Sequence, residues 1–269
     1  MFQQPSDFRD ESEELYRLLA RLADADFEQK TQFKDWTIND VLRHLHVWNW
    51  AARLSLDDPD AFGNFRARLF EAFQQSRAVG EFEKQWIDDA KGLALLEKWR
   101  EFYLAMADRF AAADPKKRVA WAGPDMSVRS SITARLMETW AHGQEVYDLL
   151  GVEREDGDRI KNIAVLGVNT FGWTFTNRGL AVPPDLPRVE LTAPSGETWT
   201  WNEPSDDNYV AGRASEFCQV VTQVRNVADT SLEVVGETAR RWMSIAQCFA
   251  GGPEEPPAPG TRHRIRPER

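Results

Sequence analysis

Four long stretches of this sequence repeat apolar residues every three or four positions, the spacing of an amphipathic helix. They cover residues 7–22, 38–55, 93–113 and 128–150. No stretch before Arg188 alternates apolar and polar residues in the manner of a β-strand. Long helices joined by loops bury their apolar stripes most simply against one another. The sequence therefore predicts a mainly α protein whose residues 1–180 form an up-and-down four-helix bundle.

Local signals mark where these helices begin and end. Thr37 and Asp40 have the spacing of a capping box, which predicts a helix from about residue 38. Asp114-Pro115 and Gly151 are typical of helix ends. Residues 58–90 form a looser segment with apolar-periodic pieces, and residues 157–178 predict one more helix.

The composition changes after a proline-rich connection at residues 182–187, which is typical of a domain boundary. Residues 188–201 place two alternating segments around Pro194-Ser195-Gly196 and predict a β-hairpin. Residues 213–226 and 237–249 have helical spacing, with a short strand between them. We therefore expect a small α+β domain over residues 181–250. Residues 251–269 are rich in proline, glycine and charge, and we expect this tail to be disordered.

The overall charge argues against several classes of partner. The formal net charge is −10, and no basic stripe interrupts it, so neither nucleic acid nor a membrane is an expected partner. No leader peptide or membrane-spanning stretch is evident in the sequence. Two cysteines, Cys218 and Cys248, lie in helical patterns, which favours free thiols in a reducing compartment. We expect a cytoplasmic protein that acts on a small molecule, as a monomer or a homodimer.

The four histidines of the chain are the most informative polar residues. His44 lies near the apolar arc of its helix, His46 points farther round, and His263 lies in the tail. Glu138 and His142 are four residues apart and share the helical face that carries Val146.

Two imidazoles and one carboxylate are a competent ligand set for Zn²⁺, and also for Ni²⁺ or Fe²⁺. The spacing alone equally allows hydrogen-bonded core histidines, because a metal site requires its ligands to converge in space.

Two segments resemble a known family. Residues 36–45, Trp-Thr-Ile-Asn-Asp-Val-Leu-Arg-His-Leu, resemble the first motif of the DinB-like bundle proteins. Residues 135–146, followed by Leu150-Gly151, are similar to the mycothiol-dependent maleylpyruvate isomerase branch of that superfamily. The resemblance implies a bundle with an interior metal held by His44, Glu138 and His142, and a small C-terminal domain. It is looser at residues 217–225, where it implies that Arg225 lies near the active site.

The resemblance also implies a thiol-dependent isomerase or transferase. A low-molecular-weight thiol, mycothiol or glutathione, would add to a small unsaturated acid, allow rotation and then leave. Arg225 would bind a substrate carboxylate, and Glu145, one turn beyond His142, would act as an acid–base or supporting residue. Trp48, Trp140 and Phe171 are candidates to line the pocket, although aromatic residues at helical spacing are more often core.

Two alternatives remain open at this point. The same ligands suit a hydrolase that uses metal-bound hydroxide. They also suit a non-catalytic protein that binds a metal or a small ligand. The long 58–90 segment and the hairpin depart from the isomerase pattern and indicate a side branch with its own substrate.

Overall fold

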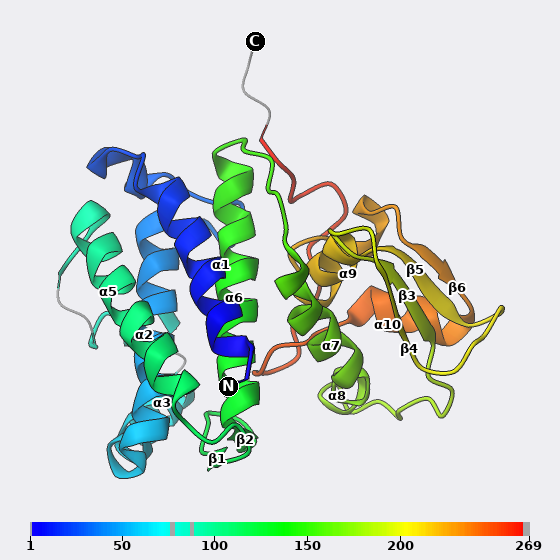
Figure 1. Cartoon of the computed structure of the whole chain (residues 1–269), viewed down its shortest axis with the longest axis horizontal. Helices are drawn as coiled ribbons and strands as arrows, with labels where there is room; N and C mark the ends of the chain where they lie inside the picture. Colours follow the sequence, from blue (N-terminus) through cyan, green and yellow to red (C-terminus); the bar gives the residue numbers. More distant parts are fainter. Residues whose placement is uncertain (1, 76–78, 87–88, 266–269) are drawn as a thin grey trace. The chain divides into compact units, whose positions relative to one another are not determined.

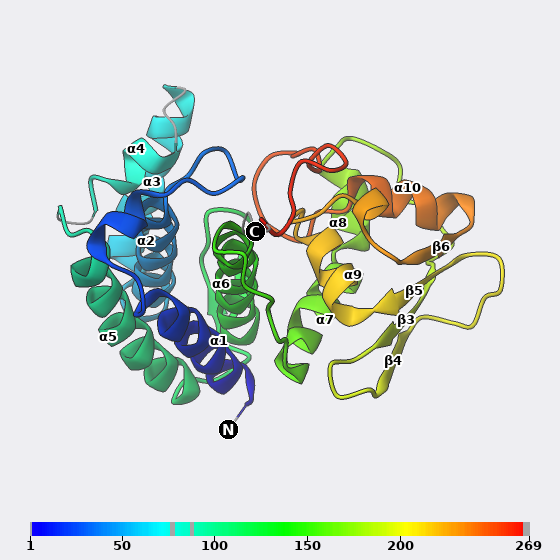
Figure 2. The same cartoon turned by 90° about the horizontal axis from the view of Figure 1, so that it is seen from above.

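A computed structural model shows two compact units, residues 1–146 and residues 147–269 (Figures 1 and 2). The structure describes residues 2–75, 79–86 and 89–265. Each unit has its own core.

The first unit is a helical bundle. Its four long helices are α1 (Gln4–Leu19), α2 (Ile38–Asp57), α5 (Gly92–Ala111) and α6 (Val128–Leu149), whose last three residues belong to the second unit. Shorter elements connect them: η1 (Asp24–Glu28), α3 (Pro59–Gln74), α4 (Val79–Glu83), β1 (Arg118–Val119) and β2 (Met126–Ser127). Helix α5 packs against both α1 and α2. The predicted four-helix bundle is confirmed.

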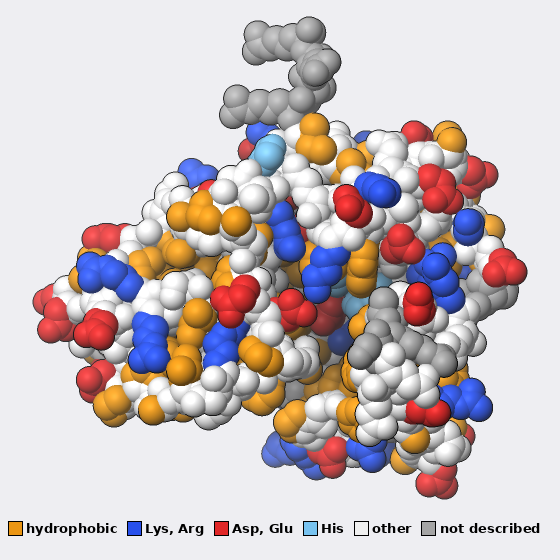
Figure 3. Space-filling model, turned by 180° about the vertical axis from the view of Figure 1, so that it is seen from behind, with side chains coloured by type: hydrophobic (Ala, Val, Ile, Leu, Met, Phe, Trp, Pro, Cys, Tyr) orange, Lys and Arg blue, Asp and Glu red, His pale blue; other side chains and the backbone are white. Residues whose placement is uncertain are grey.

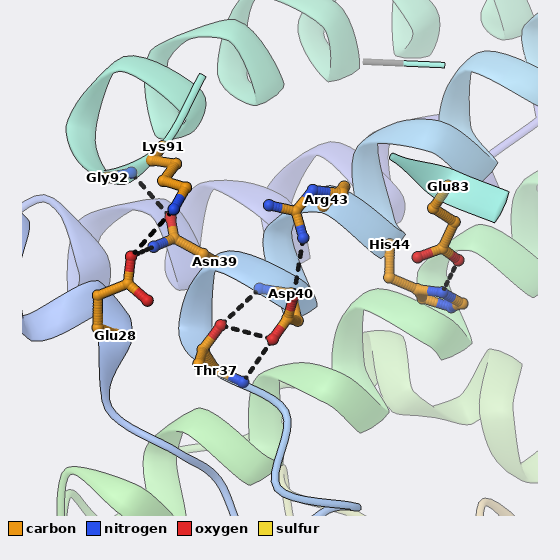
Figure 4. A network of polar contacts seen from close by, with 9 residues as sticks. All are labelled: Glu28, Thr37, Asn39, Asp40, Arg43, His44, Glu83, Lys91 and Gly92. Atoms are coloured by element: carbon orange, nitrogen blue, oxygen red, sulfur yellow. Dashed lines mark hydrogen bonds and ion pairs between the residues drawn. The ribbon is translucent and has the colours of Figure 1, made fainter. Parts of the chain in front are cut away.

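Helix α2 begins where the sequence indicates. The Thr37 hydroxyl accepts a hydrogen bond from the Asp40 amide, and the Asp40 carboxylate accepts one from the Thr37 amide (Figure 4). The same carboxylate accepts a hydrogen bond from Arg43 at 2.8 Å. This reciprocal cap satisfies amides that would otherwise lack partners. It fixes the start of the helix and therefore the direction in which His44, two turns later, projects.

The segment at residues 58–90 is more ordered than its loose periodicity indicates. Asp58 caps α3 by accepting a hydrogen bond from the Ala61 amide, and Pro59 follows at the first helical position. Phe65 of α3 contacts the rings of Phe82 and Trp86 at centroid distances of 5.3 and 4.9 Å. These aromatic contacts hold α3 and α4 together and place Glu83 at the end of α4.

The second unit combines a four-stranded sheet with short helices. Its elements are η2 (Asp158–Ile160), α7 (Lys161–Asn169), α8 (Phe171–Thr176), β3 (Arg188–Thr192), β4 (Thr198–Trp201), β5 (Tyr209–Arg213), α9 (Ala214–Val221), η3 (Val227–Asp229), β6 (Glu233–Val235) and α10 (Glu237–Ile245). The strand order is β4-β3-β5-β6. The β3–β4 and β5–β6 pairs are antiparallel, and β3 and β5 are parallel. The predicted hairpin and the α+β class of this part are confirmed.

The division of the chain differs from the sequence-based boundary at residue 180. Helices α7 and α8 belong to the second unit, where α7 packs against α9. Gly167 of α7 approaches the side chains of Phe217 and Val221 so closely that a Cβ would lie 2.8 Å from Val221. This close packing explains why α7 belongs with the sheet unit and not with the bundle.

The tail also differs from the expectation of disorder as far as residue 265. The Pro257 carbonyl accepts a hydrogen bond from Asn226, Asp229 accepts one from the Gly260 amide, and Arg262 donates to the Gln223 carbonyl. Hydrogen bonds that involve the backbone therefore hold residues 257–262 against residues 223–229, although this part of the tail has no apolar face to bury.

No helix in the described parts of the chain is both long enough and apolar enough to cross a membrane. On the face of the molecule drawn in Figure 3, basic side chains are interspersed with acidic ones.

Candidate metal centre

Three of the residues singled out in the sequence come together in the first unit. His44 lies in α2, and Glu138 and His142 lie one turn apart in α6. One donor atom from each lies within 4.8 Å of the others. Glu138 Oε2 is central, at 3.5 Å from His44 Nε2 and 3.4 Å from His142 Nε2. The convergence that the spacing alone left open is therefore present.

These separations are compatible with a set of metal ligands. A good hydrogen bond between nitrogen and oxygen spans roughly 2.7–3.2 Å, shorter than either contact. Donor atoms that lie about 2 Å from a tetrahedral zinc ion are separated from one another by about 3.3 Å. The contacts of 3.4 and 3.5 Å lie close to the second geometry, and all three donor atoms lie within 4.8 Å of one another. The three residues could thus hold a divalent cation and leave coordination positions open.

Glu83 fixes the orientation of His44. Its Oε1 lies 2.6 Å from His44 Nδ1 (Figure 4). The same oxygen accepts a hydrogen bond from Trp48 Nε1 at 2.8 Å. Glu83 is only 1% exposed. A carboxylate on Nδ1 holds the proton there and directs Nε2 toward the other two donors, as outer carboxylates do for metal-bound histidines.

Sequence reasoning missed Glu83. It lies 39 positions from His44 in a segment without a motif, and neither periodicity nor spacing connects the two residues. The one available signal was a glutamate placed directly after Phe82 among the aromatic residues of that segment.

The charges around the three residues give the two histidines different protonation behaviour. Burial alone would lower the pKa of His44, but the charges of Glu83 and Glu138 and its hydrogen bonds to them raise it to about 9. Burial and the nearby His44 lower the pKa of His142. Burial opposes ionisation of Glu138, yet hydrogen bonds from both histidines and the charge of Arg135 hold its pKa well below the usual value. Glu138 is thus an anion throughout the neutral range.

Aromatic rings surround the imidazoles. Trp36 stacks on His142 with a centroid distance of 5.4 Å and also contacts His44 at 5.1 Å. Phe33 meets the edge of the His142 ring. Both histidine side chains are only about one-eighth exposed, at 13% and 12%. The rings limit the access of water and restrict the rotation of the imidazoles.

The predicted pocket aromatics lie in different places. Trp48 contacts His44 and Glu83, as expected for a residue at the site. Trp140 is fully buried in the bundle. Phe171 packs on Phe175 and Trp242 in the core of the second unit. Trp36, which sequence reasoning used only as part of a motif, contacts the rings of both His44 and His142.

The remaining bundle candidates have distinct surroundings. Glu145 is 2% exposed in α6, three residues beyond His142, and is not one of the three residues whose donor atoms converge. Its burial distinguishes Glu145 from a solvent-exposed helical glutamate. His46 points away, as the helical wheel indicates, and packs against Phe102 at 5.2 Å.

Arg225 is buried in the second unit. It follows the end of α9 by four residues, and the chain before it turns through Gln223 with a positive φ of 58°. Its Nη2 lies 2.6 Å from Asp148 Oδ2, and its Nη1 donates to the Val224 carbonyl at 3.0 Å. The side chain therefore forms a buried ion pair and is not a solvated arginine at a helix end.

The two cysteines lie away from solvent. Both are free and buried in the second unit. Burial raises the pKa of Cys218 well above its ordinary value, which keeps its thiol protonated and inert. A thiol needed for chemistry would have to come from a separate molecule.

Comparison with known families identifies the relatives of the first unit. Residues 8–147 match the family described as the mycothiol maleylpyruvate isomerase N-terminal domain. The chain belongs to this family. The match covers α2 and the part of α6 that carries Glu138 and His142. The DinB-like resemblance of the two motifs is thereby confirmed.

Similar proteins extend over almost the whole chain. Two uncharacterized proteins of Mycobacterium tuberculosis, from strains CDC 1551/Oshkosh and H37Rv, are each 37% identical over 255 residues, which is 92% of this chain and 95% of theirs. Crystal structures of a mycothiol-dependent maleylpyruvate isomerase and of a mutant of it align with TM-scores of 0.51 and 0.50, at 15% and 16% identity. They cover 81% of this chain and 87% of theirs. At this identity the likeness shows a shared fold.

We predict that the charge of Glu83 controls the protonation of His44. In chelator-treated protein, His44 should titrate near pH 9, and Glu83→Gln should lower this pKa toward the ordinary 6.5 because the glutamine keeps an acceptor but loses the charge. Between pH 6.5 and 9 the folded state binds the extra proton, so this contribution to the free energy of unfolding declines as pH rises through that window. Titration of the imidazole signals by NMR measures it.

The matched control is Glu81→Gln, an exposed glutamate on the same helix. It should leave the His44 titration unchanged. A wild-type His44 that titrates near 6.5, or an equal shift in both variants, would contradict the assigned role of Glu83.

Proposed function

We propose that this chain is a metal- and thiol-dependent isomerase or transferase that acts on a small unsaturated or carboxylated substrate. The observation that carries the proposal is the convergence of His44, Glu138 and His142 at separations that suit metal ligands. Membership of the maleylpyruvate isomerase family supports the reaction class.

His44, Glu138 and His142 would hold the ion, for which we propose Zn²⁺, with Ni²⁺ and Fe²⁺ as alternatives that share these ligands. A divalent cation bound there would lower the pKa of a thiol or polarise a carbonyl at neutral pH. Glu83 would keep the Nε2 atom of His44 directed at the ion. Trp36 would hold the His142 ring by stacking against it.

The proposed reaction class requires no net change in the thiol. A carbon–sulfur bond forms at one carbon of a conjugated C=C bond while the electron pair moves to the conjugated carbonyl. The former double bond then rotates as a single bond. When the carbon–sulfur bond breaks, the C=C bond re-forms and mycothiol or glutathione is released unchanged. The buried cysteines of this chain supply no competing nucleophile.

Two further residues receive proposed roles. Glu145 is proposed to transfer a proton or to support the ligands of α6, because it is a buried carboxyl group close to His142 along the helix. Arg225 is proposed to bind a substrate carboxylate through the guanidinium that Asp148 holds in place.

We predict about one divalent metal ion per chain in protein purified without chelator. His44→Ala and Glu138→Ala should each abolish stoichiometric binding, because two remaining ligands hold a metal poorly. His46→Ala is the matched control, since this imidazole lies on the same helix but packs against Phe102. Elemental analysis of the three variants measures the effect. Equal metal content in all of them would contradict the ligand assignment.

A second prediction concerns the thiol. Maleylpyruvate should isomerise only when mycothiol or glutathione is added, and turnover should fall by at least about a hundredfold in Glu138→Ala, in line with the loss of a metal-site interaction. An absorbance assay with and without thiol measures this. Cleavage of esters or amides without thiol would support a hydrolase instead. Metal binding with no turnover of any thiol-dependent substrate would support a binding protein.

A further inference from the structure

A buried arginine lies beside the candidate metal centre without a hydrogen-bond partner. Arg135 is one turn before Glu138 in α6 and is 4% exposed. Its Nε is buried and unbonded, and no hydrogen bond joins its guanidinium to any residue that the structure describes. A buried cation without such bonds is unfavourable unless an anion or another polar group completes its shell.

The described residues around Arg135 contact its guanidinium but accept no hydrogen bonds from its N–H groups. Its Nη2 lies 3.9 Å from Glu138 Oε1, which is too long for a hydrogen bond. The guanidinium lies over the ring of Trp121 at 5.1 Å from the centroid, and Trp121 itself stacks on Phe62. The ring contact fixes the plane of the group, but a cation–π contact uses none of its N–H donors.

The charge of the site also favours an additional anion. Glu138 directs Oε2 at the two imidazoles and Oε1 toward Arg135. With neutral imidazoles and a divalent cation, the charges of Glu83, Glu138 and Arg135 leave one net positive charge. Because the two histidines and Arg135 are largely shielded from water, the attraction between that positive charge and an anion is screened less than it would be in solvent.

We propose that Arg135 binds the carboxylate of a small organic acid beside the candidate metal centre. A planar guanidinium with free donors matches a carboxylate through two parallel hydrogen bonds. Arg225 differs because Asp148 already neutralises its charge. The proposal deepens the proposed function by placing a substrate carboxylate within the helical unit. It rests on the proposed function in one respect, because the net positive charge of the site includes the charge of the bound metal ion.

Calorimetric titration of the full chain with succinate tests the proposal. The zinc-loaded and the chelator-treated proteins are each titrated, with succinamide as the uncharged counterpart. Arg135→Met should weaken succinate binding at least tenfold with no change in zinc content, and succinamide should not bind. Arg66→Met is the matched control, because Arg66 also contacts Trp121: its Nη1 donates a hydrogen bond to the Trp121 carbonyl oxygen at 3.5 Å. It should leave the affinity within about twofold of wild type.

A second measurement does not depend on the folding of the methionine variant. The NMR signal of the Arg135 Nε–H group is assigned by its absence in Arg135→Lys, which keeps the positive charge. Succinate should shift this signal in the wild-type protein, with the same dissociation constant as in calorimetry.

The outcomes separate this proposal from the metal proposal. Wild-type protein that fails to bind succinate, or Arg135→Met that binds it as tightly as wild type, overturns the carboxylate site and leaves the metal ligands unaffected. Succinate binding that depends on Arg135, in protein that takes up no stoichiometric zinc when zinc is supplied, supports the carboxylate site and contradicts the metal proposal.

Discussion

The placement of one ionised carboxylate, Glu138, between two imidazoles from different helices is the constraint on which the rest of the site depends. Burial makes this charge unfavourable unless positive groups or donors surround it, and the surrounding residues all address that requirement. Helix α6 supplies His142 one turn away, and helix α2 supplies His44 across the bundle. Glu83 on one side and Arg135 on the other complete an alternating arrangement of negative and positive groups around the three donors. The cap of α2 matters for function because it determines where His44 projects.

The sequence predicts those features of the structure that depend on residues close together in the chain, and it misses contacts between distant segments. The i, i+4 spacing of Glu138 and His142, the capping box at Thr37 and the PSG turn are local, and the structure has the helix face, the cap and the hairpin that they indicate. The contact between Glu83 and His44 joins a motif to a segment that has none, so periodicity could not find it. Strand β5 (Tyr209–Arg213) was also missed, because it contains a glycine and its partner β3 is separated from it along the chain by β4. The helical spacing of residues 213–226 continues past Val221, but helix α9 ends there and the chain turns at Gln223, so Arg225 lies beyond the helix.

The segment at residues 58–90 contacts the residues on two sides of the candidate metal centre. Its aromatic residues pack into a cluster that includes Phe65, Phe82 and Trp86, and this cluster carries Glu83 to the metal ligands. Trp121, against which Arg135 lies, packs on Phe62 of the same segment. This one segment between two bundle helices therefore supports both sides of the site. Because the solved structures share the fold at only 15–16% identity, the substrate is best inferred from these local contacts.

An anomalous diffraction measurement at the zinc absorption edge, on crystals of the full chain grown without chelator, tests the central claim most directly. The account predicts one peak in the first unit, bounded by His44 Nε2, a Glu138 carboxylate oxygen and His142 Nε2, with each ligand at about 2 Å. No peak at this position after zinc has been supplied, or a peak bound by other residues while these three remain hydrogen-bonded to one another, would contradict it.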